Sequence, residues 1–500
     1  MTHSKLSALS AAITTLIVST STFATDLGEG LGNGSDAVLL NNQDGHYKRW
    51  NGIGKLFLND APGCTASLLD TRDENARAVG PAYLLTAAHC VPGVIRSALT
   101  PADKYNVKFN YFNDTPTRYK THAIKGVVWK DFELTDLAIM ELDVELQALI
   151  NQGITPLALA SQWSKDATDV LIVGAPEGLE RSGLRLAACT QGPTEAELVE
   201  GDRVALKTLK NSCRDIRPGS SGSPVLDRQS GEILSVMSTS TYGAIADEQC
   251  FNNAPCEVKN GTIVWSPDTH YSSAADYLMS CFSEGVFNKD SNLCKSDAPF
   301  QLTELKYWPT QYLTMPKNAA SPDPVLNAQF SLSTPYYRFK TVREVADCSS
   351  ARNYSGTLDA KDVVLDTPIS RVAGMHYLCV IGVESAEQRP TADLMKNAWI
   401  TPAQLVERAP VRPAEPTITL GADWNYRVTW HYRIPTHFGV LYYAGPAADT
   451  DCSQIKIADY SQTFEAVTFM AEQLPLKLCS RNQDLSDRYS DVRTDLLALP

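Results

Sequence analysis

The sequence predicts an all-β protein, in which a barrel or sandwich is followed by further β-domains. Between about Gly52 and Val236, short β-type runs alternate with turn residues, and the clearest runs are GIGKLFL, AYLLTAAHC, DLAIMEL and DVLIVG. Many short strands with frequent turns are typical of barrels and sandwiches. Helical periodicity improves only in SSAADYLMSCFSEG, where Leu278, Met279 and Phe282 recur at helical spacing. We therefore expect one helix to close this domain.

The N-terminal segment 1–24 predicts a secretory signal peptide. Lys5 precedes an apolar stretch from about Leu6 to Val18, and small residues then lead to a cleavage point after Ala24. This order is that of a signal peptide. A membrane anchor is the weaker interpretation, because the stretch is short and rich in Ser and Thr. No second run is long enough to cross a bilayer, so we expect a secreted or periplasmic protein without a membrane span.

The charge balance argues against one class of partner. The chain of 500 residues carries a formal net charge of -13, and its Lys and Arg residues form no basic stripe. Binding to nucleic acid needs clustered cations that neutralise phosphates. We therefore expect no nucleic-acid partner. The length itself predicts more than one domain.

The cysteines predict disulfides. There are 12 of them, an even number in a chain expected to be secreted. They lack metal-type spacing such as two C-x-x-C pairs, so no metal site is predicted. Sequence alone does not fix which cysteines pair. Neighbouring couples would suit separate local loops, and this choice gives Cys64 with Cys90, Cys189 with Cys213, Cys250 with Cys256, Cys281 with Cys294, Cys348 with Cys379, and Cys452 with Cys479.

The composition changes beyond Cys294. Two Pro-rich segments, WPTQYLTMPKNAASPDPV and VERAPVRPAEPTITL, read as connectors and place boundaries near Asp297 and Ala409. The predicted domains are 25–297, 298–408 and 409–500. If they fold independently, a chain cut near Asp297 is expected to remain folded.

The two C-terminal domains share a weak repeat. Each contains Asp-Cys-Ser before Tyr-Ser, around Cys348 and Cys452, and each is closed by a Leu-Cys pair at Cys379 or Cys479. Alternating stretches such as YYRFKTV and YRVTWHYRI favour β-sandwiches of immunoglobulin or fibronectin type. Their Trp and Tyr residues suit either a binding face or, more commonly, a core.

Three separated motifs could carry chemistry. LLTAAHC places His89 at the end of an apolar strand, LTDLAIMEL places Asp136 at the start of another, and RPGSSGSPVLD centres on Ser221. A serine hydroxyl is a poor nucleophile until an imidazole takes its proton, and a carboxylate holds that imidazole in the right tautomer. Taken singly, each residue could instead be structural: a core histidine, a strand-initiating aspartate, or a turn serine.

Together the motifs resemble those of the trypsin-like (chymotrypsin-fold) serine proteases, over about Gly52 to Cys294. TAAHC matches the histidine motif, TDLAIMEL the aspartate motif, and GSSGSP the bacterial form of the serine motif, in the chymotrypsin order. In the family, the cysteine at the place of Cys64 pairs with the one after the histidine, here Cys90. The resemblance implies a double β-barrel. The C-terminal domains resemble fibronectin-like modules appended to bacterial secreted enzymes.

The resemblance also implies roles. His89 would act as general base and then general acid, Asp136 would orient it, and Ser221 would attack the scissile carbonyl. The backbone N–H groups of Gly219 and Ser221 would form the oxyanion hole. Gly222 would leave room beside the nucleophile.

Two departures from the family bear on activation and specificity. Ser220 stands where animal trypsins carry the aspartate that pairs with a new N-terminus, and no Ile-Val-Gly-Gly start is visible. Activation by that ion pair is not expected, and the segment from Ala24 to about Trp50 is either an ordinary N-terminal segment or a short propeptide. Met237 stands where glutamyl endopeptidases use a histidine, which argues against glutamate specificity.

The specificity pocket has a candidate in Asp215, six positions before Ser221. In trypsins an aspartate at this offset selects Arg or Lys at P1, the substrate residue before the cut bond, because a partly desolvated carboxylate is satisfied only by a cation. Ser238 and Ser240 would form the neighbouring pocket wall. Alternatively, Asp215 pairs with Arg214 or Arg217 on the surface.

The function implied by the resemblance is a secreted serine endopeptidase with protein or peptide substrates and no metal or organic cofactor. An Arg or Lys preference would follow from Asp215. A rival is a catalytically silent protease-fold protein that acts through its C-terminal modules, with a surface or matrix component as ligand. A third interpretation is an esterase on the same scaffold.

Overall fold

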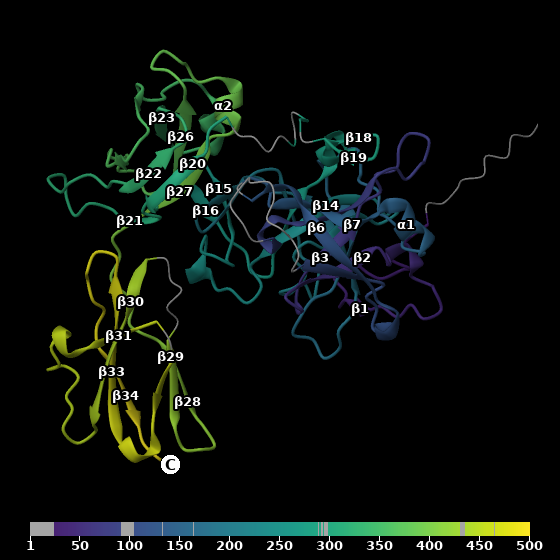
Figure 1. Cartoon of the computed structure of the whole chain (residues 1–500). Helices are drawn as coiled ribbons and strands as arrows, with labels where there is room; N and C mark the ends of the chain where they lie inside the picture. Colours follow the sequence, from purple (N-terminus) through teal and green to yellow (C-terminus); the bar gives the residue numbers. More distant parts are fainter. Residues whose placement is uncertain are drawn as a thin grey trace, which may run out of the picture.

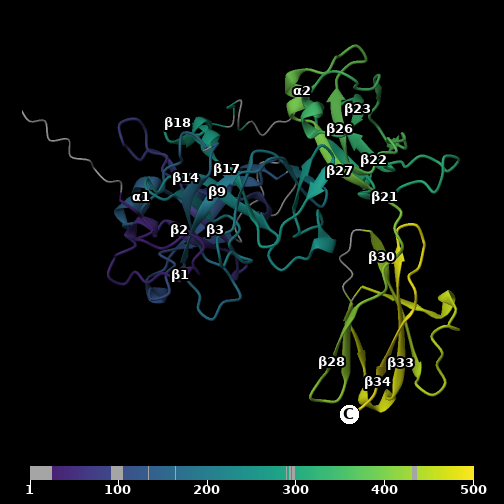
Figure 2. The same cartoon turned by 180° about the vertical axis from the view of Figure 1, so that it is seen from behind.

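The computed structural model describes residues 25–91, 105–132, 134–163, 165–288, 290–291, 294, 299–430, 436–464 and 466–500. The expected signal peptide, residues 1–24, lies outside this range, as does the boundary at Asp297. Strands dominate every described part, and helices are few and short, so the all-β prediction is confirmed. Figures 1 and 2 show the N-terminal part of the chain in purple to teal, followed by a green and a yellow β-unit. None of the helices in the described ranges is long and apolar enough to cross a membrane.

The first barrel is closed by six antiparallel strands in the order β2-β3-β4-β7-β6-β5. Their bounds are β2 Ile53–Leu58, β3 Ala61–Leu68, β4 Pro81–Ala87, β5 Tyr105–Phe109, β6 Lys120–Asp131 and β7 Leu137–Glu145; the helix α1, Leu146–Asn151, follows. Apolar side chains such as Leu84, Val107 and Met140 are fully buried within it. Three of these strands, β2, β4 and β7, match the runs GIGKLFL, AYLLTAAHC and DLAIMEL.

The second barrel is also a ring of six strands, because β8 pairs with β9 as well as with β13. Its strands are β8 Thr168–Gly174, β9 Arg185–Pro193, β12 Thr208–Asn211, β13 Pro224–Asp227, β14 Ile233–Ser240 and β17 His270–Ala274. The double barrel implied by the resemblance is therefore confirmed. The N-terminal segment adds a short strand, β1 Val38–Leu39, to the edge of β9, and buries Leu40 and Trp50 in the core.

Two excursions from the second barrel form a separate four-stranded sheet, called here the inserted sheet. It has the order β11-β10-β15-β16, with β10 Glu197–Glu200, β11 Arg203–Ala205, β15 Cys256–Lys259 and β16 Thr262–Val264. The segment RVALKTL, residues 203–209, is thus divided between β11 and β12. The tight turn between β10 and β11 consists of Gly201 and Asp202.

The prediction of a closing α-helix in SSAADYLMSCFSEG is wrong, because the segment forms the end of a strand and a 3₁₀ stretch. Its first residues, Ser272 to Ala274, belong to β17, where they pair with β12 and β14 and are buried. Only a single 3₁₀ stretch, Asp276–Cys281, follows before the chain enters the small hairpin of β18 Phe282–Ser283 and β19 Val286–Phe287. The apolar spacing reflects burial of Leu278 and Cys281 against the barrel rather than an α-helix.

The rest of the chain forms two β-modules, each with two sheets over one core. In the first β-module, strands β20 Leu302–Tyr307, β22 Ala328–Leu332 and β25 Val363–Leu365 face β21 Tyr312–Thr314, β23 Tyr336–Val342, β24 Leu358–Asp359, β26 Gly374–Val383 and β27 Trp399–Val406, with the helix α2 Ala392–Lys396. Phe330 of one sheet packs edge-to-face on Trp399 of the other. The Pro-rich segment read as a connector contains β21 and belongs to this module.

The second β-module is smaller. One sheet consists of β28 Pro416–Leu420, β29 Tyr426–Trp430 and β32 Val467–Phe469, and the other of β30 His437–Pro446, β31 Ser461–Thr463, β33 Leu476–Asp484 and β34 Arg493–Leu497. Trp430 and Tyr442 pack together between them.

All six expected disulfides are present, and the described part of the chain holds no free cysteine. Cys348–Cys379 and Cys452–Cys479 occupy corresponding places in the two β-modules, which accounts for the sequence repeat.

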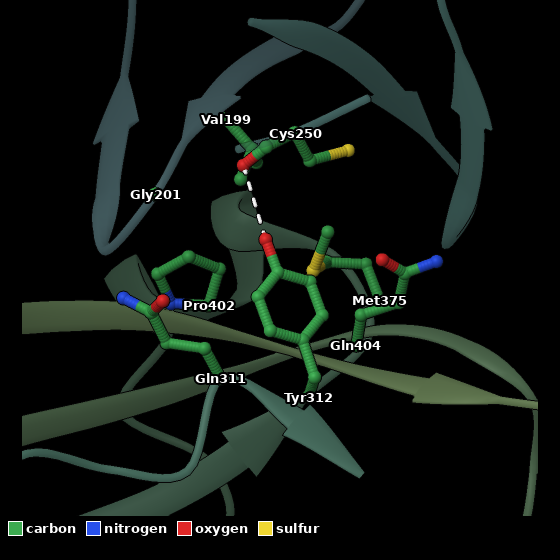
Figure 3. Close-up of a pocket in the computed structure, with 8 residues that line it drawn as sticks. All are labelled: Val199, Gly201, Cys250, Gln311, Tyr312, Met375, Pro402 and Gln404. Atoms are coloured by element: carbon green, nitrogen blue, oxygen red, sulfur yellow. Dashed lines mark hydrogen bonds between the residues drawn. The ribbon is translucent and has the colours of Figure 1, made fainter. Parts of the chain in front are cut away.

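The inserted sheet packs against the first β-module through a shared apolar cluster. Val199, Val204 and Val258 of the inserted sheet contact Met375 and Tyr377 of β26. Figure 3 shows Tyr312 reaching from the module toward Cys250, with its hydroxyl donating to the Cys250 carbonyl oxygen at 3.5 Å. The first β-module and the inserted sheet of the double-barrel unit therefore share part of a core.

Candidate active site

The three sequence motifs meet at one cleft between the two barrels. The first barrel contributes Cys64, His89 and Asp136 to its lining, and the second contributes the turn 217–221 with Ser238 and Ser240. The hairpin of the inserted sheet adds Glu200, Asp202 and Arg203. The candidate nucleophile and base thus lie on opposite walls: His89 lies just after β4, and Ser221 lies in the turn before β13.

His89 and Asp136 are paired directly. The imidazole Nδ1 of His89 lies 2.9 Å from Oδ2 of Asp136, and the backbone N–H of His89 donates to Oδ1 at 2.9 Å. Because the carboxylate can only accept, Nδ1 carries the proton, and Nε2 is the free acceptor. The carboxylate is 1% exposed, whereas the His89 side chain is 36% exposed toward the cleft. The pair therefore presents one basic nitrogen.

The charges of this pair stabilise each other. Burial alone would lower the pKa of His89, but the charge and hydrogen bond of Asp136 outweigh it, and the pKa of His89 is raised. Burial would raise the pKa of Asp136, yet the charges of His89 and Arg203 and hydrogen bonds from His89 and Ser238 hold it well below its usual range. These contacts therefore favour the ionised form of Asp136.

Ser221 lies in a turn whose backbone conformation favours glycine at positions 219 and 222. Gly219 and Gly222 both have positive φ, 87° and 81°, where a side chain is strained. A Cβ atom on Gly222 would lie 2.1 Å from the carbonyl oxygen of Thr65, in the first barrel. The close approach of the first barrel is thus a steric reason for glycine at position 222. In the described part of the chain, the Ser221 hydroxyl makes no hydrogen bond to His89, a bond that often tightens only with substrate.

The expected oxyanion-hole donors are available. Among the described residues, neither the Gly219 N–H nor the Ser221 N–H has an acceptor, while the N–H groups of Ser220, Gly222 and Ser223 are all bonded within the protein. Two unpaired N–H groups at the lining of a cleft suit a developing oxyanion. The turn is held from below: Thr65 donates through its hydroxyl to the carbonyl oxygen of Gly219 at 3.0 Å.

The two candidate pocket-wall serines line the cleft but have other partners. Ser238 donates to Oδ2 of Asp136 at 2.6 Å, so its hydroxyl supports the carboxylate rather than facing a substrate side chain. The Ser240 hydroxyl lies 2.7 Å from Nδ1 of His270. Burial lowers the pKa of His270 to about 4, which leaves its ring neutral.

Asp215 does not line the cleft with Ser238 and Ser240. Its carboxylate accepts from the backbone N–H of Ala37 at 3.1 Å and lies 3.5 Å from the guanidinium of Arg217, and it is not among the residues lining the cleft. The cause is the N-terminal segment, which adds β1 to the second barrel and covers this carboxylate.

Sequence reasoning missed two buried cations. Arg203 contacts Asp136 at 3.2 Å, and Lys55 donates to the carbonyl oxygen of Ala175 at 2.8 Å while it pairs with Glu177 at 3.0 Å. Both are nearly inaccessible to solvent, at 7% and 2%. The available signal was weak: Lys55 lies inside the apolar strand β2, and Arg203 begins the short strand β11.

One cluster in the described residues has the composition of a metal site: Cys64, His89 and Cys90 lie close together. The two cysteines form a disulfide, so neither offers a thiolate ligand.

Comparison with known proteins points to a trypsin-like peptidase domain. Residues 72–236, which include the three candidate catalytic residues, match the model of the trypsin-like peptidase domain. This match supports a protease acting on protein or peptide substrates. No curated protein matches the chain.

Several solved structures are similar over about half of the chain. The Rv3671c protease of M. tuberculosis in its inactive form is 18% identical, covering 49% of this chain and 94% of its own, with a TM-score of 0.29. Human heparin binding protein is 14% identical, covering 49% and 92%, with a TM-score of 0.32. The protease Anisep from Arthrobacter nicotinovorans is 16% identical, covering 45% and 91%, with a TM-score of 0.30.

Proposed function

We propose that the chain is a serine endopeptidase that works through Ser221, His89 and Asp136. The observation that carries the proposal is the His89–Asp136 pair, which presents a free Nε2 to the cleft that Ser221 also lines. The two unpaired N–H groups of Gly219 and Ser221 support the same chemistry. A fold of this class alone would not define an activity.

The proposed reaction has two halves. Nε2 of His89 takes the proton of Ser221 as Oγ attacks the scissile carbonyl, and the carbonyl oxygen becomes an oxyanion held by the two N–H groups. His89 then gives the proton to the leaving amine, which leaves an acyl group on Ser221. A water molecule, deprotonated by His89, attacks this ester and releases the carboxylic acid, and the proton returns to Ser221.

We also propose that the enzyme works outside the cytoplasm. Six disulfides suit an oxidising compartment, and the order of residues in 1–24 is that of a secretory signal.

An Arg or Lys preference through Asp215 lacks support. The Asp215 carboxylate is engaged by Ala37 and lies near Arg217, away from the cleft lining. We expect Asp215→Asn to leave the ratio of kcat/KM for Arg, Phe and Ala at P1 unchanged. A loss of an Arg preference in this variant would restore Asp215 to the pocket.

Active-site labelling tests the proposed function. A fluorophosphonate is expected to label the mature protein at Ser221, identified by peptide mass mapping, and Ser221→Ala is expected to abolish labelling and peptide hydrolysis while the protein stays folded. Ser223→Ala is the matched control, because its buried Oγ has no hydrogen-bond partner in the described residues. A folded wild-type protein that takes no label would favour the silent binding protein. Comparing ester with peptide substrates separates an esterase.

A further inference from the structure

Arg203 is buried against the candidate triad. Its Nη1 lies 3.2 Å from Oδ2 of Asp136, and its Nη2 lies 3.3 Å from the Ser238 hydroxyl oxygen and 3.6 Å from Oε2 of Glu200. The guanidinium carbon is 5.3 Å from the centre of the Phe132 ring. Both terminal nitrogens of the guanidinium therefore have specific partners.

Burying a cation costs free energy unless its charge and its hydrogen-bond donors are compensated. The role of Arg203 therefore follows from its partners. A guanidinium removed from water needs opposite charge and hydrogen-bond acceptors, and its planar fork bridges two groups at once. Here one arm of the fork meets the candidate catalytic carboxylate and the other reaches the serine that also donates to that carboxylate, at 2.6 Å. Asp136, Ser238 and Arg203 thus form one network behind His89.

We infer that Arg203 is a positioning residue of the triad, which fixes the Asp136 carboxylate and limits the basicity of His89. The inference rests on the proposed function. The fork and the hydroxyl of Ser238 leave Oδ2 of Asp136 in one orientation toward Nδ1 of His89. The positive charge also opposes the imidazolium that forms when His89 takes a proton, because both cations share one carboxylate.

The other charged groups around this network are few. Glu200 pairs with Arg203 from the hairpin, and its Oε1 accepts from Thr239 and from the backbone N–H of Asn253. Asp202 lies in the adjacent turn, where burial raises its pKa. Lys130, on β6, feels the charge of Asp136, while burial lowers the pKa of its ammonium group. Arg203 is the cation that contacts Asp136 among the residues described here.

The position of Arg203 depends on the first β-module. Arg203 begins β11, and the next residue, Val204, packs in the cluster with Met375 and Tyr377. The preceding turn is fixed by the Cys250 carbonyl oxygen, which accepts from the Gly201 N–H at 2.8 Å and from the Tyr312 hydroxyl at 3.5 Å. Figure 3 shows this arrangement, with Tyr312 pointing from the module into the pocket below Gly201 and Cys250. The module therefore holds the strand that delivers Arg203.

The test replaces Arg203 in the full chain and measures how the rate of fluorophosphonate labelling depends on pH. In Arg203→Gln, no second cation competes with His89 for the Asp136 carboxylate. The acid limb of the profile, where the rate rises as His89 loses its proton, is therefore expected to move to higher pH by about one unit. The plateau rate above this limb is expected to fall. In Arg203→Lys, the charge is kept but the fork is lost, so the limb is expected to return toward that of the wild type while the plateau stays low. Arg214→Gln, which removes an exposed pair with Asp36, is the matched control.

The outcomes separate this inference from the proposed function. If folded Arg203→Gln keeps the acid limb of the wild type, the inference is overturned. If that variant does not fold, Arg203→Lys provides the test. A wild-type plateau rate in Arg203→Lys would show that the planar guanidinium fork does not position Asp136, and would overturn the inference. If the wild type takes no label, the proposed function fails, and an NMR titration of His89, assigned with His89→Gln, still measures whether Arg203→Gln raises its pKa. An unchanged pKa would overturn the inference on its own.

Discussion

The ammonium group of Lys55 lies against Gly219, so close that a Cβ atom on Gly219 would be 2.8 Å from Nζ. Lys55 holds the carbonyl oxygen of Ala175 and pairs with Glu177, whose backbone N–H donates to the carbonyl oxygen of Pro218 at 2.8 Å. Burial lowers the pKa of this lysine, and Glu177 partly compensates. These contacts hold the turn that carries the candidate oxyanion donors.

Lys55→Met is therefore expected to lower kcat by roughly tenfold or more with a smaller effect on KM, because a loosened turn costs oxyanion stabilisation, where a single donor contributes about 2.7 to 4 kcal/mol. Steady-state kinetics on a peptide substrate measure both constants. Lys125→Met, which removes an exposed pair with Glu141, serves as the control. A wild-type kcat in folded Lys55→Met would show that the turn holds its shape without the lysine.

The pH dependence of the proposed activity follows from the His89–Asp136 pair. Only the neutral imidazole accepts the serine proton, and the pKa of His89 is raised, so the acid limb of kcat/KM is expected above the ordinary histidine value of about 6.5. The lowered pKa of Asp136 keeps that carboxylate charged through the limb. Asp136→Asn should move the limb to lower pH and reduce kcat by about 10⁴-fold. A wild-type limb below pH 6 would contradict the assignment.

Gly222 offers a test of packing between the barrels. In Gly222→Ala the new Cβ would meet the Thr65 carbonyl oxygen at 2.1 Å and the Thr86 hydroxyl oxygen at 2.2 Å. We expect a loss of about 3 kcal/mol or more in the free energy of unfolding, with loss of activity. Gly30→Ala is the matched control, since Gly30 has nearly the same φ, 82°, and nothing within 4 Å of an added Cβ. Equal unfolding free energies for the two variants would refute the steric argument.

The shared apolar cluster makes the first β-module part of the catalytic unit. Removing residues 298–500 would expose Val199, Val204 and Val258, so we expect a lower Tm and an acid limb shifted as in Arg203→Gln, because β11 loses its support. Removing residues 409–500 alone leaves the cluster intact and should leave both properties nearly unchanged. A chain 25–297 with the stability and pH profile of the full protein would instead bear out the independent domains that the connectors suggest.

Local signals and distant contacts divide what could be predicted. Alternating apolar runs mark most strands of both barrels, and the turn around Ser221 needs glycine for reasons visible in its own few residues. Lys55 shows the limit, because a lysine in GIGKLFL normally marks an exposed face of a strand. Its partners, Ala175 and Glu177, come from a loop more than a hundred residues away.

The same limit explains Asp215 and Arg203. The offset of Asp215 from Ser221 suggested a pocket, but strand pairing between β1 and β9 brings Ala37 to its carboxylate. Arg203 lies in a stretch whose apolar pattern predicts only a strand, and its contact with Asp136 arises from an insertion whose path no local pattern encodes.

The backbone N–H of Thr65 donates to the carbonyl oxygen of Ser221 at 2.8 Å, which links a strand of the first barrel to the turn of the second barrel that carries Ser221. A hinge motion that separated the two barrels would break this hydrogen bond and move Ser221 away from His89. The proposed endopeptidase therefore requires the two barrels to stay together throughout the reaction.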